Sequence, residues 1–158
     1  MEITTIVADP NFEIGLKLLA ALFLGMSLGV ERAIAGKTAG MRTYGLVTMG
    51  SALFVIVGII ASGGYSSPQS LSDSTRFTSQ IIAGVGFIGA GLIIFRGSQV
   101  SGVTTAAGIW VASGVGVAIG YGLYLLALLA TALALFVFTG LWYVENKVKS
   151  FSRLDHEE

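Results

Sequence analysis

The feature that most constrains this chain is a long stretch without charge. No Asp, Glu, Lys or Arg occurs between Arg96 and Glu145, and the stretch is broken only by the short Gly-Tyr-Gly at 120–122. Because about 20 apolar residues in a helix cross the hydrocarbon core of a bilayer, this stretch is long enough to cross twice. In lipid, a helix satisfies its own backbone hydrogen bonds. The sequence therefore predicts two consecutive membrane helices, at residues 103–120 and 123–144.

Composition places the rest of the chain in the same class. Of 158 residues, 54% are hydrophobic and 11% are charged, whereas soluble domains have about 25% charged residues. The mean hydropathy is +0.82. Windows of about 20 residues indicate three further spans, at 14–34, 44–61 and 77–95. We therefore predict an all-α polytopic membrane protein, with a five-helix transmembrane bundle over residues 1–145 and a short tail over 146–158.

Basic residues are unevenly distributed between the loops of this arrangement. Lys17 and Arg76 fall at the outer ends of spans one and three, where we predict that their long side chains snorkel to the interface. The other seven Lys and Arg residues lie after the first span, after the third span and in the tail: Arg32, Lys37, Arg42, Arg96, Lys147, Lys149 and Arg153. The positive-inside rule then predicts an N-terminus outside and a C-terminus in the cytoplasm.

Small residues recur at four-residue spacing on two spans, and such residues let membrane helices approach closely. The stripes are Ala21, Gly25, Gly29 and Ala33 in the first span, and Thr104, Gly108, Ala112, Gly116 and Gly120 in the fourth. Because these faces exceed what one small bundle needs, we predict a homodimer. Trp110, inside the fourth span, is predicted to fill a helix contact. The Leu-rich fifth span is predicted to face lipid.

The octapeptide GVGFIGAG at 84–91 contains G-x-G-x-x-G, the fingerprint of a dinucleotide-binding turn. That fingerprint requires a preceding strand and an acidic residue about 20 positions later. No Asp or Glu occurs between Asp73 and Glu145, and the octapeptide continues one apolar run from Phe77 to Phe95. We therefore interpret its glycines as helix-packing residues within a span.

Polar residues lead into this glycine run along one helix face. Helical spacing places Asp73, Gln80, Gly84 and Gly91 close in angle, with Arg76 at the flank. One interpretation is structural: Ser72 or Asp73 caps the helix, Arg76 snorkels to the interface and Gln80 forms a hydrogen bond with a neighbouring helix. The other is a functional polar pocket, since polar groups inside membranes are costly and often mark sites.

The first loop has the same two interpretations. Arg32 lies three residues after Gly29, on the packing face of the first span, and Glu31 could neutralise Arg32 or Arg42. These charges predict either ordinary anchoring at the interface or a buried cluster at the cytoplasmic mouth of the bundle. Ser101, Thr104 and Thr105 are interpreted as caps of the fourth span.

Two signatures resemble the MgtC/SapB family of membrane proteins. The first combines Gly29-Val30-Glu31-Arg32, Lys37 and Ala39-Gly40-Met41-Arg42-Thr43. The second combines Asp73, Arg76, Gln80-Ile81, Gly84, Gly86-Phe87, Gly89-Ala90-Gly91, Gly97, Val100, Gly102, Thr104-Thr105-Ala106-Ala107 and Trp110. The chain departs from the family pattern at Ser74, at Ala33 and at Thr78-Ser79, and we expect it to be without the cytoplasmic domain of longer members.

The resemblance implies a bacterial inner-membrane protein linked to growth under magnesium limitation, to virulence and to restraint of the ATP synthase. We expect a non-enzymatic regulator of magnesium-linked ion or energy homeostasis that acts through helix contacts in the bilayer. The alternative is a small ion transporter or channel with a path along the third span, although no acid lies at mid-membrane and magnesium favours carboxylate and water ligands.

We expect no cofactor, no metal site and no nucleic-acid partner, because the chain has no Cys, no net charge and only one His, in the tail. The expected partners are lipid, a second copy and another membrane protein such as the ATP synthase. The expected functional polar residues are Glu31, Arg32, Arg42, Asp73, Arg76 and Gln80. The expected packing or groove residues are Gly25, Gly29, Gly84, Gly86, Gly89, Gly91, Thr104, Thr105, Gly108, Trp110 and Gly116.

Overall fold

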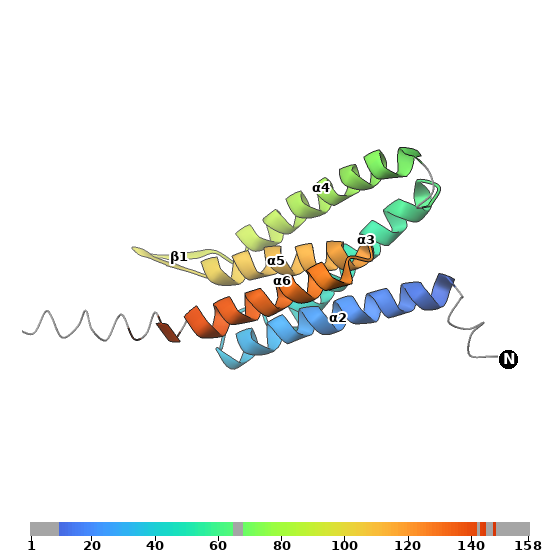
Figure 1. Cartoon of the computed structure of the whole chain (residues 1–158). Coiled ribbons are helices and arrows are strands. Elements are labelled where there is room, and N and C mark those ends of the chain that lie inside the picture. Colours follow the sequence, from blue (N-terminus) through green and yellow to red (C-terminus); the bar gives the residue numbers. More distant parts are fainter. Residues whose placement is uncertain (1–9, 65–67, 142, 145–146, 148–158) are drawn as a thin grey trace, which may run out of the picture.

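The computed structural model describes residues 10–64, 68–141, 143–144 and 147, and it confirms an all-α membrane bundle. Its helices are α2 (Pro10–Ile34), α3 (Met41–Ala61), α4 (Pro68–Ala90), α5 (Val103–Gly120) and α6 (Tyr124–Phe136), which continues into a π-helical segment, η1 (Val137–Leu141). A short hairpin of β1 (Ile94–Arg96) and β2 (Gln99–Ser101) connects α4 to α5 (Figure 1).

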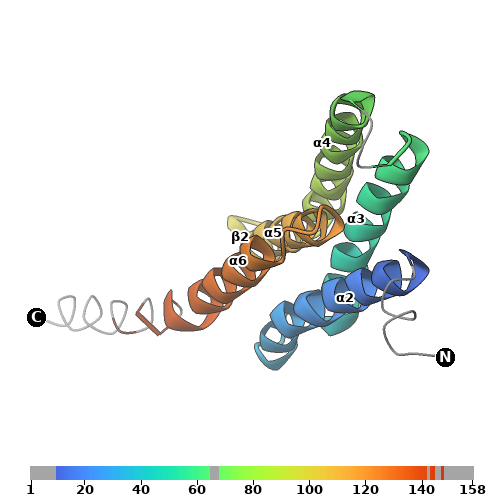
Figure 2. The same ribbon diagram turned by 45° about the vertical axis from the view of Figure 1, so that its right-hand side comes forward.

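Helix α3 lies at the centre of the bundle. It packs most extensively against α2 and α5, while α6 packs on α5 and α2. Helix α4 packs on α5 and α3, and Figure 2 shows it on the side of the bundle away from α2 and α6. Within the described residues, α6 buries only Ala127 and Thr131. This low burial agrees with the predicted lipid-facing position of the fifth span.

Glycines allow α3 to approach both of its main neighbours. A Cβ atom on Gly25 of α2 would lie 2.7 Å from the Tyr44 carbonyl oxygen, and one on Gly29 would lie 2.7 Å from the Met41 nitrogen. On α5, a Cβ on Gly116 would lie 2.9 Å from the Ser51 Cβ. The glycines of the two predicted packing faces therefore pack largely on α3 of the same chain. Ala33 and Thr104, which also belong to these faces, are exposed, and the homodimer stays a prediction.

Hydroxyl groups within this core form hydrogen bonds. The Ser51 and Ser113 hydroxyls lie 2.8 Å apart and join α3 to α5. The Thr48 hydroxyl donates to the Tyr44 carbonyl at 2.8 Å, one turn earlier in the same helix. An unpaired polar group in an apolar environment is costly, and no buried side-chain nitrogen or oxygen of the described residues lacks a hydrogen-bond partner. The centre of the bundle is thus closed and internally satisfied.

Four helices of the described chain are long and apolar enough to cross a membrane: α2, α3, α5 and the α6–η1 segment, Tyr124–Leu141. Helix α4 has 23 residues, about 35 Å of helix, but its first half is rich in Ser, Thr, Gln and charged residues. It nevertheless runs the length of the bundle, from the end where α3 stops to the end where α5 starts (Figure 1).

The predicted limits of the third helix, 77–95, were wrong at both ends. The helix begins at Pro68, a residue favoured in the first turn because its missing N–H needs no partner there. Ser72 and Asp73 therefore lie inside the helix, and the interpretation of either one as the N-cap was wrong. The helix ends at Ala90, and Phe95 lies in β1 instead. Hydropathy alone placed both limits too far along the chain.

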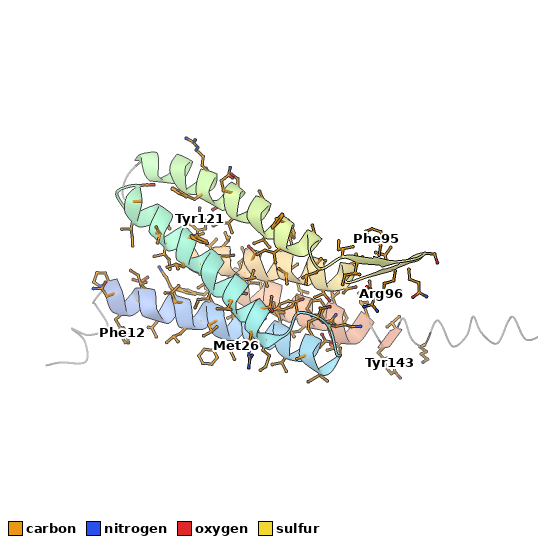
Figure 3. All side chains as sticks on the ribbon, turned by 180° about the vertical axis from the view of Figure 1, so that it is seen from behind. Phe12, Met26, Phe95, Arg96, Tyr121 and Tyr143 are labelled. Carbon is orange, nitrogen blue, oxygen red and sulfur yellow. The ribbon has the colours of Figure 1, made fainter. Side chains whose placement is uncertain are left out.

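The hairpin after α4 depends on glycine. Arg96 pairs with Gln99 across a two-residue turn, and Gly97 at the first turn position has a φ of 60°. Two-residue hairpins favour glycine at such positions because their turns require positive φ. Figure 3 shows Phe95 and Arg96 at the end of the bundle opposite Phe12, and the Phe95 side chain is 73% exposed.

The start of α5 also differs from expectation. Its N-cap is Gly102, with a φ of 88° and no side-chain cap, so the capping interpretation of Ser101, Thr104 and Thr105 was wrong. A Cβ on Gly102 would lie 2.9 Å from the Leu92 carbonyl carbon. Because both the conformation and the close approach require glycine, Gly102 replaces a side-chain cap at this corner.

Candidate functional site

A buried arginine lies at the end of the bundle where α2 stops and α3 starts. Arg32 is only 4% exposed, although it belongs to the last turn of α2. Its Nε donates a hydrogen bond to Oε2 of Glu31, with which it forms an ion pair. Its guanidinium carbon lies 4.0 Å from the ring centroid of Phe138. The cation is therefore compensated by one carboxylate and one aromatic face.

The aromatic partner comes from the far end of the described chain. Phe138 belongs to η1, the π-helical continuation of α6, and is 5% exposed. A π-helical turn holds more residues than an α-helical turn and is frequent at functional sites. It changes the direction in which the following side chains point. The neighbouring Val137 is 46% exposed, so Phe138 is the residue that this turn buries.

Helices α3 and α5 complete the surroundings of the ring. The Tyr44 hydroxyl donates to the Thr105 carbonyl at 3.2 Å, and Tyr44 is fully buried. A Cβ on Gly108 would lie 2.6 Å from Cζ of Phe138 and would collide with the Tyr44 hydroxyl. We call Glu31, Arg32, Tyr44, Gly108 and Phe138 the arginine cluster. It joins α2, α3, α5 and η1 at one end of the bundle.

The second group of predicted polar residues lies on α4. Arg76 and Gln80 are exposed, and together with Ser62 they line a hollow of about 400 Å³. The backbone of Asp73 lies one turn earlier in α4, and its side chain lies outside the described part of the chain. Because α4 starts where α3 ends, Arg76 is near the end of the bundle opposite the arginine cluster (Figure 1).

The six predicted polar residues therefore do not form one site. Glu31 and Arg32 join the arginine cluster, whereas Arg42 is exposed at the start of α3 and takes no part in it. Arg76 and Gln80 belong to the separate α4 hollow. The two groups share neither an ion pair nor a hydrogen bond among the described side chains.

The glycines of the octapeptide have different surroundings. A Cβ on Gly89 would lie 3.6 Å from the Ala106 Cβ, so Gly89 packs against α5. Around Gly84 and Gly86 nothing lies within 4 Å, and Gly91 contacts only the preceding turn. Gly84 lines a groove between α3 and α4. Of these four glycines, Gly89 packs against α5 and Gly84 lines the groove, whereas Gly86 and Gly91 contact no other helix of the described chain.

Two residues of the α5 prediction face outward. Trp110 is 55% exposed, so it is not buried in a helix contact within the described chain, and its contact with another helix stays a prediction. Thr104 is exposed as well, whereas Thr105 is buried and its carbonyl accepts the Tyr44 bond. Buried and exposed residues alternate along α5 with helical periodicity, and Trp110 falls on its outer face.

The prediction that the Lys17 side chain snorkels to the membrane interface was also wrong. Its side chain is 8% exposed and its Nζ lies 2.8 Å from Oε1 of Glu13. The reason is position: Lys17 precedes Ala21 and Gly25 by one and two turns on the buried face of α2. That face therefore holds a cation near each end, Lys17 and Arg32.

Tyr44 and Phe138 of the arginine cluster are not among the residues predicted from the sequence. A tyrosine in the first turn after a charged loop was a usable signal, because a buried phenol requires a hydrogen-bond partner. Phe138 carried no such signal, since one more aromatic residue in an apolar span is ordinary. Only the π-helical turn distinguishes it.

Comparisons with known proteins agree with the sequence signatures. The model of the MgtC family matches residues 18–147. Protein SrpB of Synechococcus elongatus is 43% identical over 132 residues, which cover 78% of this chain and 72% of SrpB. YhiD of Escherichia coli, named as a candidate magnesium transporter, is 44% identical over 76% of this chain and 56% of its own length. Protein MgtC of Salmonella typhimurium is 42% identical over 76% of this chain and 48% of its own length. The match thus spans about half the length of the last two. No solved structure matches the chain.

Proposed function

Because this chain belongs to the MgtC family, we propose that this multi-pass membrane protein is a non-enzymatic regulator of magnesium-linked ion homeostasis. It acts by helix contact with another protein of the bacterial inner membrane. The family resemblance makes the ATP synthase the first partner to test, and a second copy of the chain the next. The basic loops support an N-terminus outside and a C-terminus in the cytoplasm.

The observation that carries this proposal is the contrast between a closed core and an open α4. Glycines hold α2, α3 and α5 in backbone contact, and no buried polar side-chain atom of the described residues lacks a partner. On α4, by contrast, the outward face of Ala83, Gly86 and Phe87 is uncovered, and Phe87 is 85% exposed. A glycine beside an exposed aromatic residue suits close approach of a partner helix.

The donor chemistry also favours regulation over magnesium carriage. Magnesium requires near-octahedral oxygen ligation, generally from carboxylates and water. Among the described residues, no group of three His, Cys, Asp or Glu side chains could hold a metal ion. The names of YhiD and MgtC nevertheless link relatives to magnesium, and a regulator accounts for the link without an ion path.

Gly86→Leu tests the proposed contact face. Because nothing lies within 4 Å of Gly86, the variant should fold, yet a leucine would hold a partner helix away. In a strain that depends on this chain for growth at low magnesium, we expect growth to be lost while the amount of protein in the membrane is unchanged. Gly15→Leu, at an equally open position on α2, should grow normally. Normal growth with Gly86→Leu would exclude this face.

The hollow at Arg76 and Gln80 favours one alternative, a small transporter whose path follows α4. Purified protein in proteoliposomes should then carry magnesium, protons or phosphate. Gln80→Leu should abolish the flux, since the carboxamide is a polar group of that path. Absence of flux for all three ions would reject this alternative.

A further inference from the structure

Two adjoining cavities lie between α3 and α4. The larger, about 630 Å³, is walled by Val47, Gly50 and Phe54 of α3 and by Ile81, Gly84 and Ile88 of α4, among others. The smaller is the hollow of about 400 Å³ at Arg76. Phe77 and Gln80 line both cavities, so the two adjoin along α4, with Arg76 in the wall of the smaller one and a mostly apolar wall in the larger one. We use "this space" for the two adjoining cavities together.

Specific contacts fix the walls of this space. A Cβ on Gly58 would lie 2.9 Å from the Phe77 ring, so the absence of a side chain there admits the ring against α3. The Thr78 and Tyr121 hydroxyls lie 2.8 Å apart and tie α4 to the turn after α5. The close approach of Gly89 to α5 fixes the other end of α4. The groove is therefore part of the fold.

The polar end has donors that meet no partner among the described side chains. Among the described residues, neither the Arg76 guanidinium nor the Gln80 carboxamide forms an ion pair or a hydrogen bond. The Ser62 hydroxyl, by contrast, already donates to the Gly58 carbonyl at 2.8 Å. From the described side chains, an occupant of this end would thus meet one cation and one amide donor. That donor set suits a phosphate, which arginine binds well.

We propose that this space binds one glycerophospholipid, with its phosphate at Arg76 and Gln80 and an acyl chain along the α3–α4 groove. The dimensions agree: from Arg76 to Ile88 the helix rises about 18 Å, close to one leaflet of a hydrocarbon core about 30 Å thick. A partner helix would be apolar along its whole contact, whereas this space is polar at one end only, as a lipid is. The proposal is independent of the proposed regulatory function.

Lipid binding by the purified full-length chain tests the proposal. The protein is stripped of lipid in detergent, supplied with phosphatidylglycerol or with diacylglycerol of the same chains, and examined by native mass spectrometry. We expect one phosphatidylglycerol per chain. Removing the cation with Arg76→Gln should weaken its binding about fivefold, the effect of about 1 kcal/mol per basic residue. Arg96→Gln, at the exposed hairpin, is the charge control and should bind as the unmodified protein does.

A pair of glycine variants tests the groove itself. Gly84→Leu places a side chain into the groove, whereas Gly86→Leu adds the same side chain to α4 outside it, and neither position has an obstructing atom within 4 Å. We expect phosphatidylglycerol occupancy to fall at least tenfold with Gly84→Leu and to stay unchanged with Gly86→Leu. Equal loss with both variants would indicate nonspecific lipid contact and overturn the proposal.

Two further outcomes would overturn it. If diacylglycerol binds as tightly as phosphatidylglycerol and Arg76→Gln changes nothing, the space takes an acyl chain without a phosphate. If a second copy of the chain covers the groove in place of a lipid, Gly84→Cys should form a disulfide between two chains. The sequence has no other cysteine, so any disulfide must join the two introduced residues.

Discussion

Replacing Gly116 by leucine is expected to prevent normal assembly of the bundle. At this position α5 crosses α3 with no room for a side chain: even a Cβ would collide with the Thr48 carbonyl oxygen and lie 2.9 Å from the Ser51 Cβ. Backbone cannot rotate out of the way as a flexible side chain can, so α3 and α5 must separate. The Ser51–Ser113 bond would be lost with their packing.

The cost should exceed the usual 1–3 kcal/mol of overpacking, and we expect the amount of chain in the membrane to fall about tenfold. Quantitative immunoblotting of membrane fractions measures this amount. Gly114→Leu is the matched control, since it lies two residues earlier on the same helix with nothing within 4 Å. Wild-type levels of Gly116→Leu would mean that the α3–α5 contact is not as close as described.

Arg32→Leu should destabilise the protein strongly. The substitution leaves the Glu31 carboxylate, whose side chain is 19% exposed, without its cation, and it removes the guanidinium from the Phe138 ring. Breaking a buried pair by removing one partner costs about 3–5 kcal/mol. The partial exposure of Glu31 favours the lower figure, and a fall in Tm of about 10 °C follows for a chain of this size. Thermal unfolding in detergent measures it.

Two controls separate charge from packing. Arg42→Leu removes an exposed cation nearby and should leave Tm unchanged. Glu31→Leu combined with Arg32→Leu removes both charges, so part of the stability lost in the single variant should return. A single variant as stable as the parent, or a double variant less stable than the single one, would contradict a compensated ion pair at this position.

The helices that cross lipid could be predicted from sequence because hydropathy and length decide them. The α5 bounds, Val103–Gly120, match the predicted span, since glycines at 102 and 122 stop the helix on either side. Helix α4 could not be placed in the same way. Its polar first half is helical because Phe77 and Thr78 pack on α3 and on Tyr121, and such tertiary contacts leave no hydropathy signal.

In the candidate site, too, some features could be predicted from the sequence and others depend on tertiary contacts. Arg32 could be placed on a packing face because it follows Gly29 by three residues, and helical geometry fixes that relation. Its contact with Phe138 could not be predicted, because it depends on a π-helical turn more than one hundred residues later. Lys17 was mispredicted because the rule that lysines snorkel ignores the helix face on which a lysine falls.

The two buried cations of α2 also constrain how this molecule can change shape. Lys17 and Arg32 lie about 22 Å apart along the helix axis, each held beside its own acid. A piston-like shift of α2 by one turn, about 5.4 Å, would carry one cation into the apolar layer of Ala21 and Leu28. Because that transfer is prohibitively costly, α2 cannot shift along its own axis by a full turn. Any working motion must then come from the elements packed around α2.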